Sequence, residues 1–240
     1  MSSRNILITG GSRGIGKAIS ELLDSELDQN SEKLYPEIYA PNSKDLDQSS
    51  EESIQSFIDN NKLQGKEFYG IIINAGIHHS CEFESIQSGD WQRVIDINLN
   101  GAFYIIQNFL GNLKLFQERN PKLYPRIILM SSVSAYTGEL YAPAYAASKA
   151  ALIVLAKSLA LEFAKYQINI NCICPGWVKT DMSLEQMNNN ESIIRDNLGA
   201  TLQNRWIEPE EVAATVSYLL NDSSKAITGQ QINLTAGLDL

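Results

Sequence analysis

The eight residues Thr9-Gly10-Gly11-Ser12-Arg13-Gly14-Ile15-Gly16 decide the fold of this chain. Before them, residues 5–9 form a short run that predicts a buried strand, and after them Ile19, Leu22 and Leu23 follow a helical period. Glycines between a strand and a helix permit a tight turn and let a phosphate approach the backbone N–H groups at the helix N-terminus. We therefore predict a phosphate-binding turn, and the alternative is a tight turn that binds nothing.

The rest of the chain alternates between strand-like and helical segments. Further strands are predicted at residues 35–40, 70–75, 127–130, 168–174 and 231–234. Helices are predicted after Asp47, where Ser49 or Ser50 would be the N-cap, near residues 91–118, through 145–166 and from Pro209 onward. Uninterrupted apolar strands are typical of parallel sheets that helices cover on both faces. The order predicts an α/β fold, a single-domain doubly wound parallel sheet over residues 1–240.

The composition narrows the class of protein. Among 240 residues the hydrophobic share of 44% is enough for one large core, and the net charge of −9 argues against a nucleic-acid partner, which needs clustered Lys and Arg. The longest apolar stretch, residues 150–164, contains charged side chains and is too short to cross a bilayer, so we expect no membrane span. Cys81, Cys172 and Cys174 lack a zinc-type spacing, so we expect neither a metal site nor a disulfide. No signal-peptide pattern precedes the first strand, and a cytoplasmic location is expected.

Further motifs follow the glycine turn along the chain. They are Asn74-Ala75-Gly76, Asn98 within residues 97–101, Ser132, Tyr145-Ala146-Ala147-Ser148-Lys149, Pro175-Gly176 with Val178 and Thr180, and Thr228-Gly229-Gln230. Ser132 precedes Tyr145 by thirteen residues, and Lys149 follows Tyr145 by four. Side chains four apart lie on the same face of a helix, so a phenol and an amine are predicted to be neighbours.

The glycine turn and these motifs resemble, along nearly the whole chain, those of the short-chain dehydrogenase/reductase family. The resemblance implies a Rossmann-type fold and an enzyme that transfers a hydride between a nicotinamide cofactor and a ketone or secondary alcohol. It implies that Tyr145 is the acid/base, that Ser132 binds the carbonyl oxygen, that Lys149 holds the nicotinamide ribose and that Asn98 positions a water. The alternative is a hydrogen-bonded core with Lys149 as a surface cation.

The neighbouring amine gives the phenol of Tyr145 its expected chemistry. A free phenol has a pKa of about 10 and is a poor base at neutral pH. A nearby ammonium favours the phenolate and lowers that pKa. One exposed Lys149 would not lower it enough in water, so we expect the cationic ring of the oxidised cofactor and a half-buried site to supply the rest.

The predicted cofactor contacts lie in the glycine turn, after the second strand and around the catalytic helix. They are Gly10, Ser12, Arg13, Gly14, Ile15, Gly16, Lys44, Asp45, Leu46, Asn74, Ala75, Gly76, Tyr145, Lys149, Pro175, Gly176, Val178 and Thr180. No carboxylate, the group that binds the adenosine ribose of NAD, follows the second strand before Asp45. Arg13 could bind a 2′-phosphate bidentately with help from Lys44, so NADP(H) is favoured over NAD(H). Alternatively, both are solvated surface charges.

The segment between the second strand and Asp45 is unusually short. Only four residues separate Ala40 from Asp45, where a typical member of the family has a helix and another strand. Asp45-Leu46 resembles the pair that the family places beside the adenine. We therefore predict that the second helix is missing. Whether the third, edge strand is present stays open at this point, and its loss would leave a six-stranded sheet.

Two kinds of carbonyl substrate remain open, one bound to an acyl carrier and one a free small molecule. Residues 10–16, 131–134 and 175–182 resemble the 3-oxoacyl-[acyl-carrier-protein] reductases of the family. Those reductases usually carry a basic residue after the active-site helix, where this chain has Tyr166-Gln167, and a net charge of −9 disfavours an acidic carrier. A cofactor-sensing protein without turnover is a third hypothesis, which the retained Tyr145 and Lys149 disfavour.

Three further expectations concern the surroundings of the site. The polar segment 183–203 is predicted to be the substrate lid. The helix after Lys149 has too little polar surface for a free helix, so we expect a homodimer or homotetramer. His78 and His79 border the cleft in a loop and are expected to lie in solvent.

Overall fold

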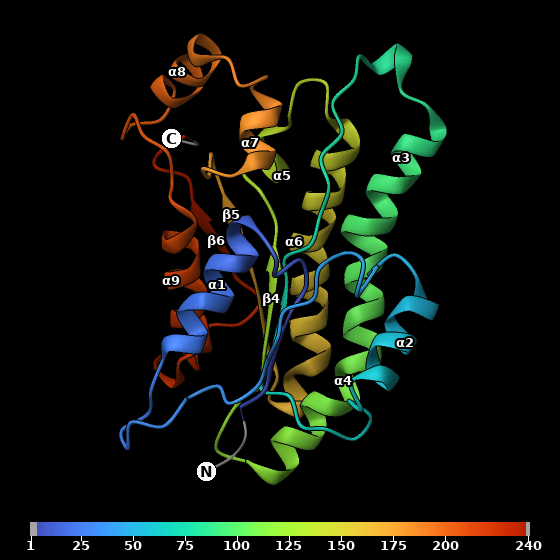
Figure 1. Cartoon of the computed structure of the whole chain (residues 1–240), viewed down its shortest axis with the longest axis vertical. Coiled ribbons are helices and arrows are strands. Elements are labelled where there is room, and N and C mark those ends of the chain that lie inside the picture. The colour runs from blue at the N-terminus through green and yellow to red at the C-terminus, as the bar shows by residue number, and fades with distance from the viewer. Residues whose placement is uncertain (1–3, 239–240) are drawn as a thin grey trace.

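The computed structural model describes residues 4–238, which form one parallel sheet between two layers of helices (Figure 1). The strands are β1 (Ile6–Ile8), β2 (Ile38–Tyr39), β3 (Gly70–Ile73), β4 (Arg126–Met130), β5 (Asn169–Pro175) and β6 (Gln231–Leu234). The α-helices are α1 (Gly14–Ser25), α2 (Glu51–Asn60), α3 (Ser88–Ile95), α4 (Gly101–Arg119), α5 (Ser134–Thr137), α6 (Pro143–Phe163), α7 (Asp181–Gln186), α8 (Glu191–Gly199) and α9 (Pro209–Leu220).

The sheet confirms both the predicted fold class and the predicted shortening. Its strand order is β2-β1-β3-β4-β5-β6, and every neighbouring pair is parallel. The edge strand β2 is two residues long, and the chain then passes through a turn at residues 42–46 directly into α2. Ser50 is the N-cap of α2 and accepts a hydrogen bond from the Ser53 N–H, as one of the two predicted caps.

The four central strands, β1, β3, β4 and β5, bury both of their faces, as the uninterrupted apolar runs predicted. Ile6 and Ile8 pack against α1 and α9 on one side of the sheet, while Leu7 packs with the layer of α2, α4 and α6 on the other. The alternation follows from the two-residue period of a strand. Burying such a side chain stabilises the fold by about 1.5–3 kcal/mol, so the sheet is fixed from both faces.

The predicted long helix near residues 91–118 is confirmed, because α3 continues into α4 through a wider helical turn. Residues Asp96–Asn100 form a π-helical turn between α3 and α4. The Gln48 amide donates to the Ile97 carbonyl at 2.7 Å and to the Ala75 carbonyl at 3.1 Å, so a side chain takes up a carbonyl within this turn. Insertions of this kind widen a helix locally, and such turns often occur at functional sites.

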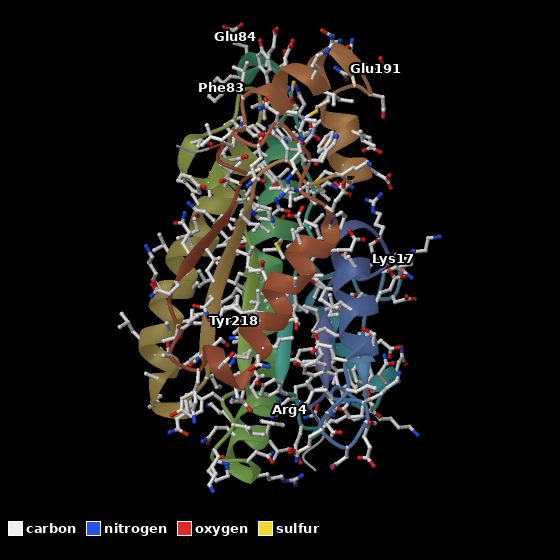
Figure 2. The ribbon with its side chains drawn as sticks, turned by 90° about the vertical axis from the view of Figure 1, so that its left-hand side faces the viewer. Arg4, Lys17, Phe83, Glu84, Glu191 and Tyr218 are labelled. Atoms are coloured by element: carbon white, nitrogen blue, oxygen red, sulfur yellow. The ribbon has the colours of Figure 1, made fainter. Side chains whose placement is uncertain are left out.

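The carboxyl ends of the strands face α5, α7 and α8 at one end of the molecule (Figure 1). Figure 2 shows Phe83, Glu84 and Glu191 at that end, while Arg4, which precedes β1, lies toward the other. Ligands of open α/β sheets bind outside the carboxyl ends of the strands. This end therefore holds the candidate site.

Helix α6 is long and apolar enough to cross a membrane by length and composition alone, and it is the one such helix among the described residues. Its residues Leu152, Ile153 and Ala156 are buried in the core beside the sheet. The same helix begins with the segment that contains Tyr145 and Lys149. Its apolar character is therefore that of a helix packed between the sheet and the outer surface.

Candidate active site

The glycine turn has the backbone geometry that only glycine adopts easily. Gly10 and Gly14 have φ values of +66° and +52°. A Cβ atom on Gly16 would lie 2.2 Å from the Gly10 carbonyl oxygen, so α1 begins directly against the turn. Gly11 has a similar role toward the next segment, because its Cβ would lie 2.5 Å from that of Ala40. The sequence did not predict this close contact between Gly11 and Ala40.

The segment after β3 holds this turn in place. Thr9 Oγ1 accepts hydrogen bonds from the N–H groups of Asn74 and Ala75, at 3.1 and 3.0 Å. The Asn74 amide donates in turn to the carbonyls of Thr9 and Gly10, at 3.1 and 3.2 Å. Asn74 and Ala75 thus fix the shape of the turn, while their predicted direct contact with the cofactor stays a prediction.

The N-terminus of α1 is suited to an anion. Its N-cap residue, Arg13, makes no side-chain capping bond, and the first turn contains no acidic side chain among the described residues. Ser12 and Arg13 are exposed, Gly14 and Ile15 are partly buried, and Gly14 faces the Thr180 methyl group, 3.2 Å from where a Cβ would lie. Uncapped N–H groups and the helix dipole both favour a phosphate here.

The segment after β2 forms a tight turn around Asn42. The Asn42 Oδ1 accepts from the Lys44 N–H at 2.7 Å, and its amide donates to Asp45 Oδ2 at 2.5 Å. Lys44 and Asp45 are exposed, and both line a pocket of about 550 Å³ beside Ala40. Leu46 is 6% exposed and packs in the hydrophobic core, so a cofactor contact from Leu46 would have to come from its backbone.

The loops after β3 and β5 complete the predicted cofactor surface. A Cβ atom on Gly76 would lie 3.2 Å from both Asn98 Oδ1 and Lys149 Nζ, so the missing side chain leaves room between these two groups. Pro175 ends β5, and Gly176 lies against the Thr235 backbone. Further along the same loop, Val178 is buried in a bridge with Ile207, and Thr180 caps α7.

The structure brings Ser132, Tyr145 and Lys149 together at the start of α6. Ser132 follows the end of β4 and is 8% exposed, and its hydroxyl is hydrogen-bonded to the Tyr145 hydroxyl. Lys149 is 4% exposed, and its Nζ lies 5.5 Å from the centroid of the Tyr145 ring. Lys149 Nζ donates to the Met130 carbonyl at 2.8 Å, which ties α6 to the end of β4.

Asn98 lies in the π-helical turn and is 1% exposed. Its Oδ1 accepts from the Ile77 N–H at 2.8 Å, and its Nδ2 donates to the Ile77 carbonyl at 2.9 Å and to Ser148 Oγ at 3.1 Å. The side chain therefore connects the loop after β3 with α6. Its predicted role in positioning a water stays a prediction.

Comparisons with known proteins agree with this geometry. A family model described as enoyl-(acyl carrier protein) reductase matches residues 11–239. The 3-oxoacyl-[acyl-carrier-protein] reductase FabG of Aggregatibacter actinomycetemcomitans is 32% identical, over 98% of this chain and 99% of the relative. The crystal structure of a short chain dehydrogenase family protein from Francisella tularensis superposes with a TM-score of 0.82 at 29% identity and covers 98% of both chains. The chain belongs to the short-chain dehydrogenase/reductase family.

A second solved structure bears on the cofactor of this short-chain dehydrogenase/reductase. The RhlG/NADP active-site complex of Pseudomonas aeruginosa is 28% identical, with a TM-score of 0.84, and covers 100% of this chain and 98% of that one. Enzymes of the family use a nicotinamide cofactor. The uncapped α1 helix, the glycine turn and the open space at Gly76 fit such a group. When bound, it supplies or accepts the hydride.

Burial controls the ionisation of the predicted catalytic pair in this short-chain dehydrogenase/reductase. Burial raises the pKa of Tyr145 to about 12, the hydrogen bond with Ser132 opposes that rise, and the Glu139 carboxylate adds to it. Burial also lowers the pKa of Lys149 to about 8. The sequence-based expectation that a half-buried site would help to lower the Tyr145 pKa was therefore wrong, because desolvation disfavours the charged phenolate.

Sequence reasoning also missed a pair beside the site. His78 was expected in solvent, yet its side chain is 9% exposed, and its Nε2 lies 2.6 Å from Glu139 Oε1. The His78 ring meets the Tyr145 ring edge-on, with 4.9 Å between the centroids. The His79 side chain is 37% exposed, which is closer to the expected position in solvent. The available signal was a histidine two residues after the Asn74–Gly76 motif and an acid between Ser132 and Tyr145.

Proposed function

We propose that this short-chain dehydrogenase/reductase uses NADPH to reduce a 3-oxoacyl thioester, carried on an acyl carrier protein, to the 3-hydroxyacyl thioester. The observation that carries the proposal is the hydrogen-bonded pair of Ser132 and Tyr145, with Lys149 beside it, at the carboxyl ends of the strands. Two hydroxyl groups that meet at one point can both bind a single carbonyl oxygen.

In the proposed reaction, Tyr145 is the acid. The carbonyl oxygen of the substrate lies between Ser132 and Tyr145, and Tyr145 donates its proton to that oxygen as the carbonyl carbon receives the hydride. A pKa of about 12 keeps the phenol protonated in the cofactor-free site, which suits the direction of reduction. Lys149 holds the nicotinamide ribose hydroxyls. Acid catalysis of this kind typically contributes about 10²–10⁴ in rate.

The preference for NADP(H) rests on Arg13 and Lys44. Both are exposed beside the glycine turn and the segment after β2, where no carboxylate precedes Asp45. A carboxylate there would repel a 2′-phosphate, whereas a guanidinium binds it. Hydrogen bonds to charged groups contribute about 1.5–3 kcal/mol, so Arg13→Ala should raise the KM for NADPH at least tenfold and leave that for NADH within twofold. Equal effects on both cofactors would contradict the assignment.

A carrier-bound substrate is supported by local positive charge. The relative from Aggregatibacter is named for the reduction of such substrates. This chain has Tyr166 where the carrier-protein reductases usually have a basic residue. Two cations are nevertheless close to that position, because Lys114 and Lys165 lie 3.9 and 4.9 Å from the centroid of the Tyr166 ring. These cations could bind an acidic carrier despite the net charge of −9.

The substrate class is tested by NADPH oxidation with a matched set of substrates. A 3-oxoacyl group on an acyl carrier protein, the same group on coenzyme A and a free ketone of similar size should give decreasing kcat/KM values. The corresponding trans-2-enoyl thioester should cause no oxidation of NADPH. Lys114→Glu with Lys165→Glu should lower kcat/KM for the carrier-bound substrate alone. The second candidate is a reductase of free small molecules, which the net charge of −9 favours because it disfavours an acidic carrier. Turnover of the free ketone alone would support this second candidate.

Three surrounding features belong to the same proposal. Residues 183–203, which include α8 and part of α7, form the substrate lid over the carboxyl ends of the strands. Phe103 on α4 and Val154 and Leu161 on α6 are large, exposed apolar side chains, which fit a homodimer or homotetramer interface. The three free cysteines fit a reducing, cytoplasmic setting.

A further inference from the structure

His78 and Glu139 form a mostly buried ionisable pair that the proposed reaction does not use. They lie 61 residues apart in the chain, in the loop after β3 and in the loop between α5 and α6. Their side chains are 9% and 20% exposed, and Nε2 and Oε1 are 2.6 Å apart. Burying ionisable groups costs free energy unless they are hydrogen-bonded or paired, so a pair at this depth indicates a structural or functional role.

The backbone around the pair is fixed on both sides. On one side, the two hydrogen bonds from Asn98 to Ile77 hold the residue that precedes His78. On the other, Gly138 has a φ of +75°, which turns the chain sharply just before Glu139. The Cys81 N–H also donates to the Tyr141 carbonyl at 2.8 Å, so the two loops are joined without the pair. The two loops are therefore held together without the His78–Glu139 pair, and this pair has another role.

The second oxygen of Glu139 leads to the reaction site. Ser134 Oγ donates to Glu139 Oε2 at 2.6 Å, and Ser132 Oγ donates to Ser134 Oγ at 3.1 Å. Ser132 is bonded in turn to Tyr145, whose ring contacts the ring of His78. The five side chains form a closed circuit around the point where the carbonyl oxygen would bind.

A carboxylate can only accept hydrogen bonds, and this property sets the order of the circuit. Because Glu139 accepts from Ser134, the lone pairs of Ser134 remain for the proton of Ser132. The lone pairs of Ser132 Oγ are thereby turned toward the Tyr145 hydroxyl. Without the carboxylate, the Ser134 hydroxyl would be free to rotate, and Ser132 would lose its fixed partner. Reactions are sensitive to such changes, because small misplacements of a binding group cost rate.

We propose that Glu139, held by His78, is a positioning residue that acts through Ser134 to hold Ser132 Oγ beside the Tyr145 hydroxyl, at the point where the substrate carbonyl binds. The inference rests on the proposed function, since it assigns a role toward the same reaction. It predicts that loss of the link reduces turnover but leaves cofactor binding intact, because the hydrogen bonds of Glu139 and Ser134 lead to Ser132 and not to the glycine turn.

The test compares two variants that break the link with two that leave it in place. Ser134→Ala and Glu139→Gln should each lower kcat about tenfold, the loss of roughly one hydrogen bond. Ser134→Thr, which retains the hydroxyl, should recover most of that loss. Glu84→Gln removes an exposed acid from a neighbouring loop (Figure 2) and should leave kcat within twofold. The Kd for NADPH, measured by fluorescence, should stay within twofold in all four, and thermal denaturation checks folding.

A pH profile separates positioning from a purely structural role. Tyr145 is faced by His78, Glu139, Ser132 and Lys149. Since the Glu139 carboxylate raises the Tyr145 pKa, Glu139→Gln should move the high-pH decline of kcat for reduction to lower pH, and Ser134→Ala should not move it. If Glu139→Gln does not fold, Ser134→Ala against Ser134→Thr decides.

The outcomes distinguish this inference from the proposed function. A wild-type chain that reduces no carbonyl substrate overturns the proposed function and the inference together. Wild-type turnover with kcat unchanged in Ser134→Ala and Glu139→Gln overturns the inference alone. A loss of NADPH binding that matches the loss of kcat also overturns it, because the pair would then support the fold of the site and not the substrate carbonyl.

Discussion

Tyr145 and Lys149 lie one helical turn apart, and burial changes their pKa values in opposite directions. The phenol is kept neutral, as an acid must be before it donates a proton. The amine is held in an apolar site at the end of β4, where its charge is disfavoured. The predicted role of Lys149 therefore places this amine where it weakens the cofactor-free fold.

Replacing Lys149 by an apolar side chain of similar length should stabilise the cofactor-free protein. The pKa of Lys149 falls from 10.5 to about 8 on folding. We expect Lys149→Met to raise the free energy of unfolding at pH 7 by about 1–3 kcal/mol, while turnover is lost. Urea denaturation of both proteins without cofactor measures the difference.

The same substitution predicts a pH dependence with a definite sign. Between about pH 8 and pH 10.5 the unfolded chain holds the Lys149 proton more tightly than the folded chain, so wild-type stability gains from this group as the pH rises. The advantage of Lys149→Met should therefore be largest below pH 8 and shrink toward pH 10.5. A variant that is less stable than wild type at pH 7, or a difference that does not change with pH, would contradict the account.

At the scale of elements, the junction of β1, the glycine turn and α1 forms the predicted cofactor site. Gly16 lets α1 begin against the Gly10 carbonyl, and Asn74 holds the turn from β3. The uncapped N-terminus of α1 is then fixed at the carboxyl end of the sheet. Small movements of this helix would move the predicted phosphate site with it.

A methyl group at Gly16 should displace α1 from the turn. Because the added Cβ would lie 2.2 Å from a backbone oxygen, we expect Gly16→Ala to destabilise the fold by about 1–3 kcal/mol. The Kd for NADPH should rise at least tenfold, as measured by fluorescence titration. The matched control is Gly111→Ala in α4, where nothing lies within 4 Å, and it should raise stability by about 0.5–1 kcal/mol without affecting Kd. Unchanged cofactor binding in Gly16→Ala would argue against the site.

The elements could be predicted from the sequence to the extent that their signals are local. Buried strands such as Gly70–Ile73 are continuous apolar runs, and β6 has the predicted bounds. The π-helical turn between α3 and α4 could not be predicted, because the side chain that bonds to it, Gln48, is distant in the chain. The His78–Glu139 pair was missed for the same reason, since only the fold brings the two loops together.

At the scale of the whole molecule, α4 and α6 both expose large apolar side chains on the surface. Leu161 is 84% exposed and Val154 is 62% exposed, one above the other on α6, and Phe103 on α4 is 46% exposed. The first and last turns of α6 thus serve different purposes. One carries the predicted catalytic residues, and the other presents apolar side chains outward.

Charges on this outer face should dissociate the proposed oligomer. We expect wild-type protein to elute as a dimer or tetramer in size exclusion with light scattering, and Val154→Glu with Leu161→Glu to give a smaller species that remains folded. Leu27→Glu, at a similarly exposed leucine in a loop, is the control and should not change the assembly. A monomeric wild-type protein would contradict the interface.

The central step of the proposed reaction is the direct transfer of a hydride to a carbonyl carbon while Tyr145 supplies the proton. The most direct measurement uses NADPH that carries deuterium at the reactive carbon, with a 3-oxoacyl thioester as substrate and mass spectrometry of the product. The account predicts one deuterium at the carbinol carbon with wild-type protein and at least a 100-fold lower rate with Tyr145→Phe, with NADPH still bound. An unlabelled product, or an undiminished rate in Tyr145→Phe, would contradict it.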